Sequence, residues 1–341
     1  MVLQTIWFFL WGLLWAVYFM TDGFDLGLGS LLPFVARDEK DRRAVYRAMG
    51  PIWDGNEVWL IAAGGVTFAA FPTVYAVMFS SLYSPLMLIL FALILRGVSF
   101  EFRSQVESAA WRRMWDAGTF VGSFLPAVLF GVAFANIFQG IPFDGNGVYR
   151  GSLLTLLNPY GLLGGLLFLL LFLEHGALWL AVKTDGPLHD RAVSTAKTLW
   201  PAVLVAAVLF LGASAAATDL YANYLGQPLL SLVILAAVAG LLGIRFFLRS
   251  GAAWKAWIAS SLAIGSATFY GVIGLFPAVF PSSLDPAYSL TAHNASSSPL
   301  TLKIMLGVTL AFVPVVLAYQ TWAYMLFRDT VHGEEEPDVH Y

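Results

Sequence analysis

The chain has 341 residues, of which 59% are hydrophobic and 11% are charged, and its mean hydropathy is +0.76. Soluble globular proteins carry about 25% charged residues, so this composition excludes a soluble domain and predicts an integral membrane protein. The net charge of −3 gives no sign of a nucleic-acid partner, and the absence of cysteine excludes disulfides, thiolate metal ligands and iron–sulfur clusters.

Apolar runs recur along the whole chain, and each is long enough to cross a bilayer, which takes roughly 20 residues of helix. The sequence therefore predicts a single all-α transmembrane domain over 1–328, followed by a polar cytoplasmic tail at 329–341. We expect nine spans at about 5–33, 51–71, 75–102, 114–139, 159–182, 197–217, 228–249, 254–279 and 301–327.

Lysine and arginine gather in the odd-numbered connections between these spans, around 37–47, 103–113, 183–197 and 245–255. The even-numbered connections hold almost none, with Arg150 and Lys303 as the exceptions. The positive-inside rule then places the odd connections and the C-terminus in the cytoplasm and the N-terminus outside.

Four inward hairpins and one extra helix favour two four-helix bundles and a peripheral helix. We expect the bundles at about 1–140 and 159–280, and the peripheral ninth helix at about 301–327. The longer outer connections at 140–158 and 280–300 are rich in Gly, Pro, Ser and Asn and are predicted to fold as turns.

Six charged side chains interrupt the first three spans, in the predicted cytoplasmic half of the membrane: Asp22, Asp25, Asp54, Glu57, Arg96 and Glu101. Asp22 and Asp25 are three positions apart, as are Asp54 and Glu57, which places each pair on one helix face. A charge at the bilayer centre costs roughly 2.5–3.5 kcal/mol on insertion scales, so such side chains usually face a partner or a wet cavity.

Two interpretations of these charges remain open. In the first, they form a proton entry route from the cytoplasm, because carboxyl groups can take up and pass on protons. Asp54 is then the main candidate, followed by Asp22 and Asp25, with Arg96 and Glu57 beside them. In the second, they are a structural ion-pair cluster that joins the first three spans.

Trp59 is followed by a stretch of small residues that includes Ala63. Small residues usually allow helices to pack closely. Alternatively, they leave a dry gap through which an apolar gas diffuses.

His175 is the one histidine inside a predicted span. A haem held by two histidines would need a second one, which the spans do not offer. The sequence therefore predicts no metal ligands in this chain, and a packing or proton-coupled role for His175.

Eight segments in chain order resemble subunit II of cytochrome bd-type quinol oxidases, and together they cover nearly the whole chain. They are TDGFDLG (21–27), WDGNEVWL (53–60), RGVSFEFR (96–103), WRRMWDAGTFVGSFLP (111–126), GVAFANIFQGIPF (131–143), NPYGLLGG (158–165), FPSS (280–283) and SLTAHNASSSPLTL (289–302).

The resemblance implies a nine-helix subunit of an oxidase in the prokaryotic inner or plasma membrane. The complex would oxidise quinol, reduce dioxygen to water and take protons from the cytoplasm. The resemblance also implies a partner, subunit I, that holds haem b, haem d and the quinol site, so this subunit would have no catalytic residue of its own. A bound quinone and small single-helix accessory subunits are further expected companions.

The resemblance also implies roles for particular residues. Asp54 would contribute to proton supply, with Asp22 and Asp25 nearby, and Trp59 would lie at the mouth of a lateral oxygen channel.

Two other classes of function would also account for parts of this sequence. A proton-coupled secondary transporter would also have many spans and buried carboxylates, but inverted repeats and a broken helix pair at mid-membrane are not visible in the sequence. A purely structural membrane scaffold would leave the acidic cluster unexplained.

Overall fold

The computed structural model describes residues 1–331, and these fold into an all-helical protein with a small two-stranded sheet, which confirms the predicted all-α class. In chain order the elements are α1 (Val2–Val35), α2 (Glu39–Met49), α3 (Trp53–Ala70), α4 (Pro72–Ser81), α5 (Tyr83–Phe102), α6 (Ala109–Gln139), α7 (Leu153–Leu156), α8 (Pro159–Lys183), α9 (Gly186–Ala217), α10 (Tyr221–Gly226), η1 (Pro228–Ser231), α11 (Leu232–Arg249), α12 (Ala253–Leu275), β1 (Ala278–Phe280), η2 (Pro286–Tyr288), β2 (Leu290–Thr291) and α13 (Pro299–Leu326).

Among residues 1–331, eight helices are long and apolar enough to cross a membrane: α1, α5, α6, α8, α9, α11 with the preceding η1, α12 and α13. The predicted span at 51–71 corresponds to α3, which has 18 residues and carries Asp54 and Glu57 near its start. Because α3 is not among the eight, the count of nine spans remains a prediction.

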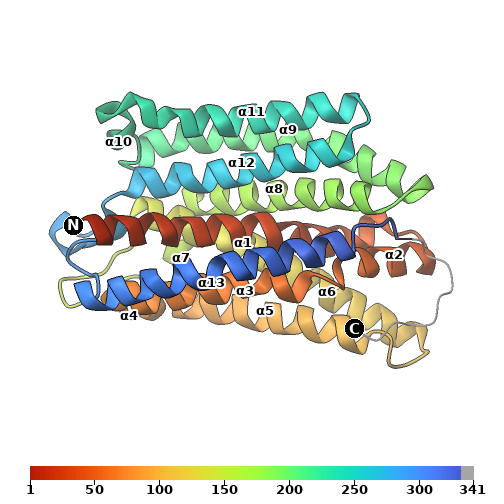
Figure 1. Ribbon diagram of the computed structural model, residues 1–341, viewed down its shortest axis with the longest axis horizontal. Coiled ribbons are helices and arrows are strands. Elements are labelled where there is room, and N and C mark those ends of the chain that lie inside the picture. The colour runs from red at the N-terminus through yellow and green to blue at the C-terminus, as the bar shows by residue number, and fades with distance from the viewer. Residues whose placement is uncertain (332–341) are drawn as a thin grey trace.

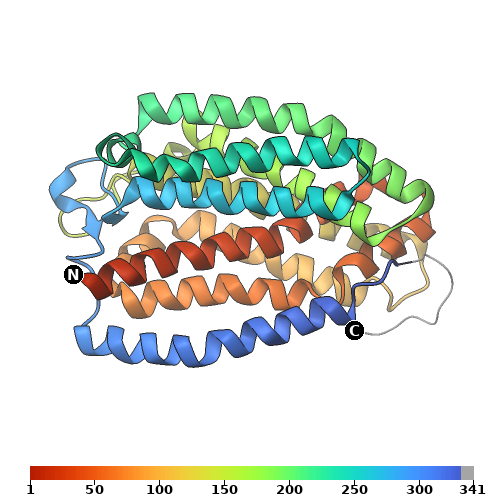
Figure 2. The same cartoon turned by 45° about the horizontal axis from the view of Figure 1, so that its top comes forward.

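The long helices run side by side along the long axis of the molecule, with α1 in the middle (Figure 1). α1 packs against α3 and α6 and also against α8 and α12. Figure 2 shows α9, α11 and α12 on one side of α1, and α13 along the outer edge of the opposite side. The division into bundles at about 1–140 and 159–280 remains a prediction.

Glycines set the close approach of α1 and α8. A Cβ atom at Gly27 would lie 1.7 Å from the backbone oxygen of Phe172, and one at Gly176 would lie 2.4 Å from the backbone nitrogen of Leu28. Only glycine fits where two backbones come this close. This contact fixes how α1 is rotated, and so which of its faces presents Asp22 and Asp25.

Several predicted boundaries were wrong. The span predicted at 75–102 consists of α4 and α5, which are separated at Leu82. The connection predicted at 183–197 is mostly helix, because α9 already begins at Gly186 with a proline in its first turn. The outer connections contain more than turns, since 140–158 includes α7 and 280–300 includes β2, which pairs antiparallel with β1.

The connection predicted at 37–47 contains a helix that the hydropathy pattern did not show. α2 lies at the end of the molecule opposite the N-terminus (Figure 1). Asp38 caps it by accepting a hydrogen bond from the Asp41 backbone N–H at 2.8 Å, and its buried face includes Val45 and Met49. Most of the predicted tail at 329–341 lies outside the described residues.

Candidate functional site

Three helices bring a buried arginine and two carboxylates together. Arg96 of α5 is fully buried, and its Nη2 donates to Oδ1 of Asp22 on α1 at 2.6 Å. The same nitrogen donates to Oε1 of Glu57 on α3. These residues were predicted to lie close together, and the structure places them in one cluster.

Asp25 extends this cluster along the same face of α1. It is fully buried, and its Oδ2 accepts a hydrogen bond from the Asn56 Nδ2 at 2.7 Å. The Asn56 Oδ1 accepts in turn from the hydroxyl of Tyr324 on α13, at 2.8 Å. Asp22, Asp25, Glu57, Arg96 and Asn56 are called the acidic cluster below.

The acidic cluster is only partly satisfied by hydrogen bonds within residues 1–331. Oδ2 of Asp22, Oδ1 of Asp25, and both Nε and Nη1 of Arg96 are buried without a partner there, as is the hydroxyl of Tyr18. Buried polar groups are nearly always hydrogen-bonded, because an unpaired one costs about 1–3 kcal/mol. The unmatched atoms therefore mark a place that can accept further hydrogen-bonding or proton-carrying groups.

Exposure falls in steps from the surface into the acidic cluster. Asp54 is exposed in the first turn of α3 and makes no hydrogen bond or ion pair with residues 1–331. The side chain of Glu57, one turn further along, is 24% exposed, while those of Asp22 and Arg96 are 0% exposed. Glu101 is exposed and outside the cluster. Asp54 thus lies at the accessible end of a line of carboxylates.

Trp59 and Ala63 are both buried. The indole N–H of Trp59 donates to Oε1 of Gln320 on α13 at 3.0 Å, which connects α3 to α13. An apolar cavity of about 890 Å³ lies beside them, between α1, α3, α4, α5 and α6. Gly64 and Thr67 of α3 line it, whereas Trp59 and Ala63 do not.

His175 is placed in a way that does not suit haem ligation. Its Nδ1 is 2.6 Å from Oγ of Ser260, its Nε2 is 2.9 Å from the backbone oxygen of Met20, and its ring stacks on Trp257. Both ring nitrogens are therefore already occupied. The neighbouring Glu174 is buried, and neither of its carboxyl oxygens has a partner within residues 1–331. In the same part of the chain, no group of three or more acidic or histidine side chains could hold a metal ion.

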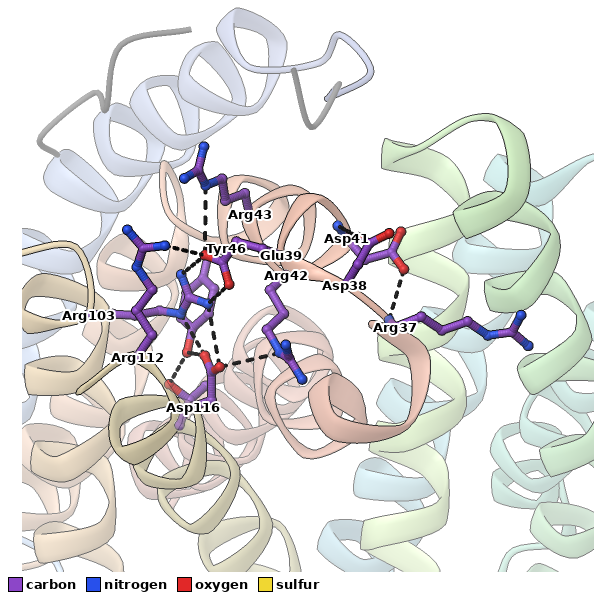
Figure 3. A network of polar contacts seen from close by, with 11 residues as sticks. Arg37, Asp38, Glu39, Asp41, Arg42, Arg43, Tyr46, Arg103, Arg112 and Asp116 are labelled. Atoms are coloured by element: carbon purple, nitrogen blue, oxygen red, sulfur yellow. Dashed lines mark hydrogen bonds and ion pairs between the residues drawn. The ribbon is translucent and has the colours of Figure 1, made fainter. Parts of the chain in front are cut away.

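A second polar network lies at the α2 end of the molecule (Figure 3). Arg103, at the end of α5, donates through Nη1 and Nη2 to Glu39 at 3.0 and 3.1 Å, and through Nε to Asp116 at 2.6 Å. Tyr46 donates to Asp116 at 3.1 Å and lies under the Arg103 guanidinium. These four residues join α2, α5 and α6, and they are called the cytoplasmic network below, after the side of the membrane on which the sequence predicts them.

Charge in the cytoplasmic network favours the ionised form of its carboxylates. Partial burial would raise the pKa of Glu39, but the hydrogen bonds and charge of Arg103, with Arg112 and Arg43 nearby, outweigh it and lower that pKa. From the sequence, the arginines of this network predicted only the membrane topology, and not their ion pairs with Glu39 and Asp116.

Sequence reasoning missed three residues of the site. Asn56 lies within WDGNEVWL, between Asp54 and Glu57. An amide inside a predicted span needs a hydrogen-bond partner, so this residue could have been predicted to belong to the site. Gln320 and Tyr324 are four residues apart on α13, so they share one helix face. Nothing local shows that this face meets α3, because the partners lie more than 260 residues away in the chain.

The family model that describes cytochrome bd terminal oxidase subunit II matches residues 3–327 of this chain. The chain belongs to the cytochrome bd terminal oxidase subunit II family. It is 38% identical to the cytochrome bd-I ubiquinol oxidase subunit 2 of Escherichia coli K12, over 95% of this chain and 93% of that protein. It is 36% identical to the cytochrome bd ubiquinol oxidase subunit 2 of Bacillus subtilis 168, over 98% of each chain.

The fold is also similar to a chain in the structure of the bd oxidase from Geobacillus thermodenitrificans. The TM-score is 0.78 at 17% sequence identity, and the match covers 96% of this chain and 99% of that one. These findings confirm the family that the eight sequence motifs indicated, and they support a multi-pass bacterial membrane protein.

Proposed function

We propose that this chain is the second subunit of a quinol-oxidising terminal oxidase in a bacterial cytoplasmic membrane, and that it supplies cytoplasmic protons for reduction of dioxygen to water. Each dioxygen needs four electrons and four protons to become two waters, so such an enzyme needs a proton route into the membrane. The acidic cluster is the observation that carries this proposal.

Protons would enter at Asp54, the exposed carboxylate, and pass toward the buried members of the cluster by way of Glu57. Glu57 shares the Arg96 guanidinium with Asp22, so a proton bound by one carboxylate changes the electrostatic environment of the other. The unmatched oxygens of Asp22 and Asp25 offer places for the next hydrogen bond in the route. The structural interpretation, an ion-pair cluster that joins three helices, is compatible with this role.

Haem b, haem d and the quinol site would belong to a partner, subunit I. In the complex the haems would carry out electron transfer and oxygen chemistry. Both ring nitrogens of His175 are engaged by Ser260 and Met20, which supports haem ligation by the partner and not by this histidine.

The membrane arrangement is proposed from the charge distribution. α3 would be the second of nine spans, with the N-terminus outside and the cytoplasmic network inside. The exposed apolar surfaces of α11 and α13 would face lipid, and they leave room for small single-helix subunits.

Oxygen would reach the complex through the apolar cavity next to α3. Dioxygen is small and apolar, so a path lined by apolar atoms needs no hydrogen bonds. Gly64 lines the cavity and a Cβ atom there would have no neighbour within 4 Å, so the larger side chain of Gly64→Leu should narrow the cavity.

We expect Gly64→Leu to raise the Michaelis constant for oxygen while turnover at saturating oxygen changes little. Oxygen consumption measured against oxygen concentration in purified complex checks this. Ser80→Ala is a control at the same cavity that removes an atom instead of adding bulk. An unaltered oxygen dependence in assembled Gly64→Leu would show that oxygen enters elsewhere.

The oxidase assignment is tested by purifying the complex through a tag on this chain. We expect haem b and haem d bands in the reduced-minus-oxidised spectrum, together with oxygen consumption that depends on quinol. A chain that purifies without haem proteins and drives proton-coupled solute uptake in vesicles would instead support the transporter alternative.

A further inference from the structure

α13 makes an unusual set of contacts for a peripheral helix. Within the described α13, Leu302 is the one buried residue, so apolar packing holds this helix weakly. Polar side chains instead connect its second half to α3. Gln320 and Tyr324 both reach the segment of α3 from Gly55 to Trp59, which also contains Asn56 and Glu57 of the acidic cluster.

The orientation of the Gln320 amide is fixed by its partners. The Trp59 indole N–H can only donate, and it meets Oε1 of Gln320 at 3.0 Å. The backbone oxygen of Gly55 can only accept, and it meets Nε2 at 2.8 Å. Flipping this amide would break both hydrogen bonds. Gln320 therefore connects α13 to α3 in one amide orientation only.

The Asn56 amide is different, because both of its partners can change roles. A carboxylate at Asp25 only accepts, whereas a carboxylic acid there could donate. The Tyr324 hydroxyl can donate or accept. The observed orientation, with Nδ2 toward Oδ2 of Asp25 and Oδ1 toward Tyr324, gives an ionised Asp25 a hydrogen-bond donor and has Tyr324 donating.

We propose that Tyr324 is a positioning residue for Asp25: its hydroxyl holds the Asn56 amide so that the amide N–H, and not its oxygen, faces the carboxylate. The inference rests on the proposed role of the acidic cluster in proton supply. α13 is then more than a peripheral helix, because it sets which atom of the Asn56 amide faces Asp25, and an amide N–H there favours the ionised carboxylate.

The other charged and titratable groups around Asp25 stay in place when Tyr324 is changed. They are Asp22 on α1, Glu57 on α3 and Arg96 on α5, and Tyr18 on α1 interacts with the same three residues. On α8, His175 is bonded to Met20 and Ser260 instead. Removing the Tyr324 hydroxyl therefore changes one hydrogen bond to Asn56 and leaves the charges of the acidic cluster intact.

The experiment uses Tyr324→Phe in the intact oxidase complex, with Tyr319→Phe as the matched control. Tyr319 lies on the same helix but is 64% exposed. The Asp25 carboxyl band is identified in infrared difference spectra by its loss in Asp25→Asn. We expect this band to shift in Tyr324→Phe and to stay unshifted in Tyr319→Phe.

Turnover against pH is the second readout. Tyr324→Phe removes the neutral hydrogen bond that holds the Asn56 amide N–H toward an ionised Asp25, and one such bond contributes about 0.5–1.5 kcal/mol. We therefore expect the alkaline limb of the turnover profile to move to higher pH by about 0.4–1.1 units. Tyr319→Phe should keep the wild-type profile.

Gln320→Met separates positioning from simple loosening of α13, because it removes two bonds to α3 but keeps the Tyr324 hydroxyl. We expect its Asp25 band to match the wild type. A shift equal to that of Tyr324→Phe would mean that loosening accounts for the effect, and would overturn the inference. Failure of Tyr324→Phe to assemble a haem-containing complex would also overturn the inference.

The inference and the proposed function fail in different ways. An unshifted Asp25 band in assembled Tyr324→Phe overturns the inference, whatever the turnover. Wild-type turnover in Asp25→Asn would remove Asp25 from proton supply, while the band comparison still decides what Tyr324 does.

Discussion

Two arginines of α5 lie seven residues apart in contrasting surroundings. Arg103, in the cytoplasmic network, has an acceptor for each of its three guanidinium nitrogens, shared between Glu39 and Asp116. Arg96, in the acidic cluster, uses Nη2 for both Asp22 and Glu57, while Nε and Nη1 have no partner within residues 1–331. The better-matched arginine is thus the one at the end of α5, and the fully buried one is within the helix.

This contrast distinguishes a structural contact between helices, the cytoplasmic network, from a candidate functional site, the acidic cluster. A guanidinium with matched acceptors holds its helices in one arrangement, and nothing in that geometry invites a further group. Burying a guanidinium and carboxylates whose hydrogen-bonding atoms are partly unpaired costs free energy. Buried polar groups of this kind are typical of functional sites in membrane proteins. The acidic cluster therefore fits a site through which protons move.

Removing Arg96 should have the largest effect. Arg96→Met would leave Asp22 and Glu57 without their shared cation, and breaking a buried ion pair by removing one partner costs roughly 3–5 kcal/mol. We expect little assembled complex, measured as haem recovered per milligram of membrane protein. Arg103→Met should assemble better, because Glu39 and Asp116 are partly exposed to water. The reverse order of recovery would contradict the distinction between the two arginines.

Acid should weaken the cytoplasmic network by a smaller amount. The pKa of Glu39 in the folded protein is below its ordinary value of 4.5, so ionised Glu39 stabilises the fold above that pH. The stabilisation is lost as the pH falls through the lowered pKa. We therefore expect the melting temperature of wild-type complex to fall more between about pH 6 and about pH 3 than that of Glu39→Gln.

The control for this acid titration is Glu101→Gln, which changes an exposed carboxylate outside the network. Glu101→Gln should keep the acid sensitivity of the wild type. Equal acid sensitivity in wild type and Glu39→Gln would mean that Glu39 does not couple pH to stability.

Charge spacing predicted the core of the site well. A separation of three residues placed Asp22 with Asp25, and Asp54 with Glu57, on shared helix faces, and the cost of isolated charge in lipid required a partner such as Arg96. The structure brings together four of these five. It leaves Asp54 exposed, which no spacing rule could show, because exposure depends on how α3 packs.

The rest of the site depends on contacts between distant parts of the chain. Tyr324 reaches Asn56 only because α13 returns along α1 and α3. α2 escaped prediction because its 11 residues are strongly charged, and its apolar face becomes visible only once it packs against the bundle. The early start of α9 was missed because Gly186 and Pro187 resemble a loop, although proline is favoured in the first turn of a helix.

The most direct test of the account is proton uptake by Asp54→Asn in proteoliposomes that contain oriented, fully assembled complex. Asparagine keeps the shape of the side chain but cannot carry a proton. We predict that uptake from the cytoplasmic side and quinol-driven turnover both fall roughly tenfold or more, with haem content unchanged and Glu101→Gln like the wild type. Wild-type uptake and turnover in assembled Asp54→Asn would contradict the claim that protons enter at Asp54 and pass from there to the acidic cluster.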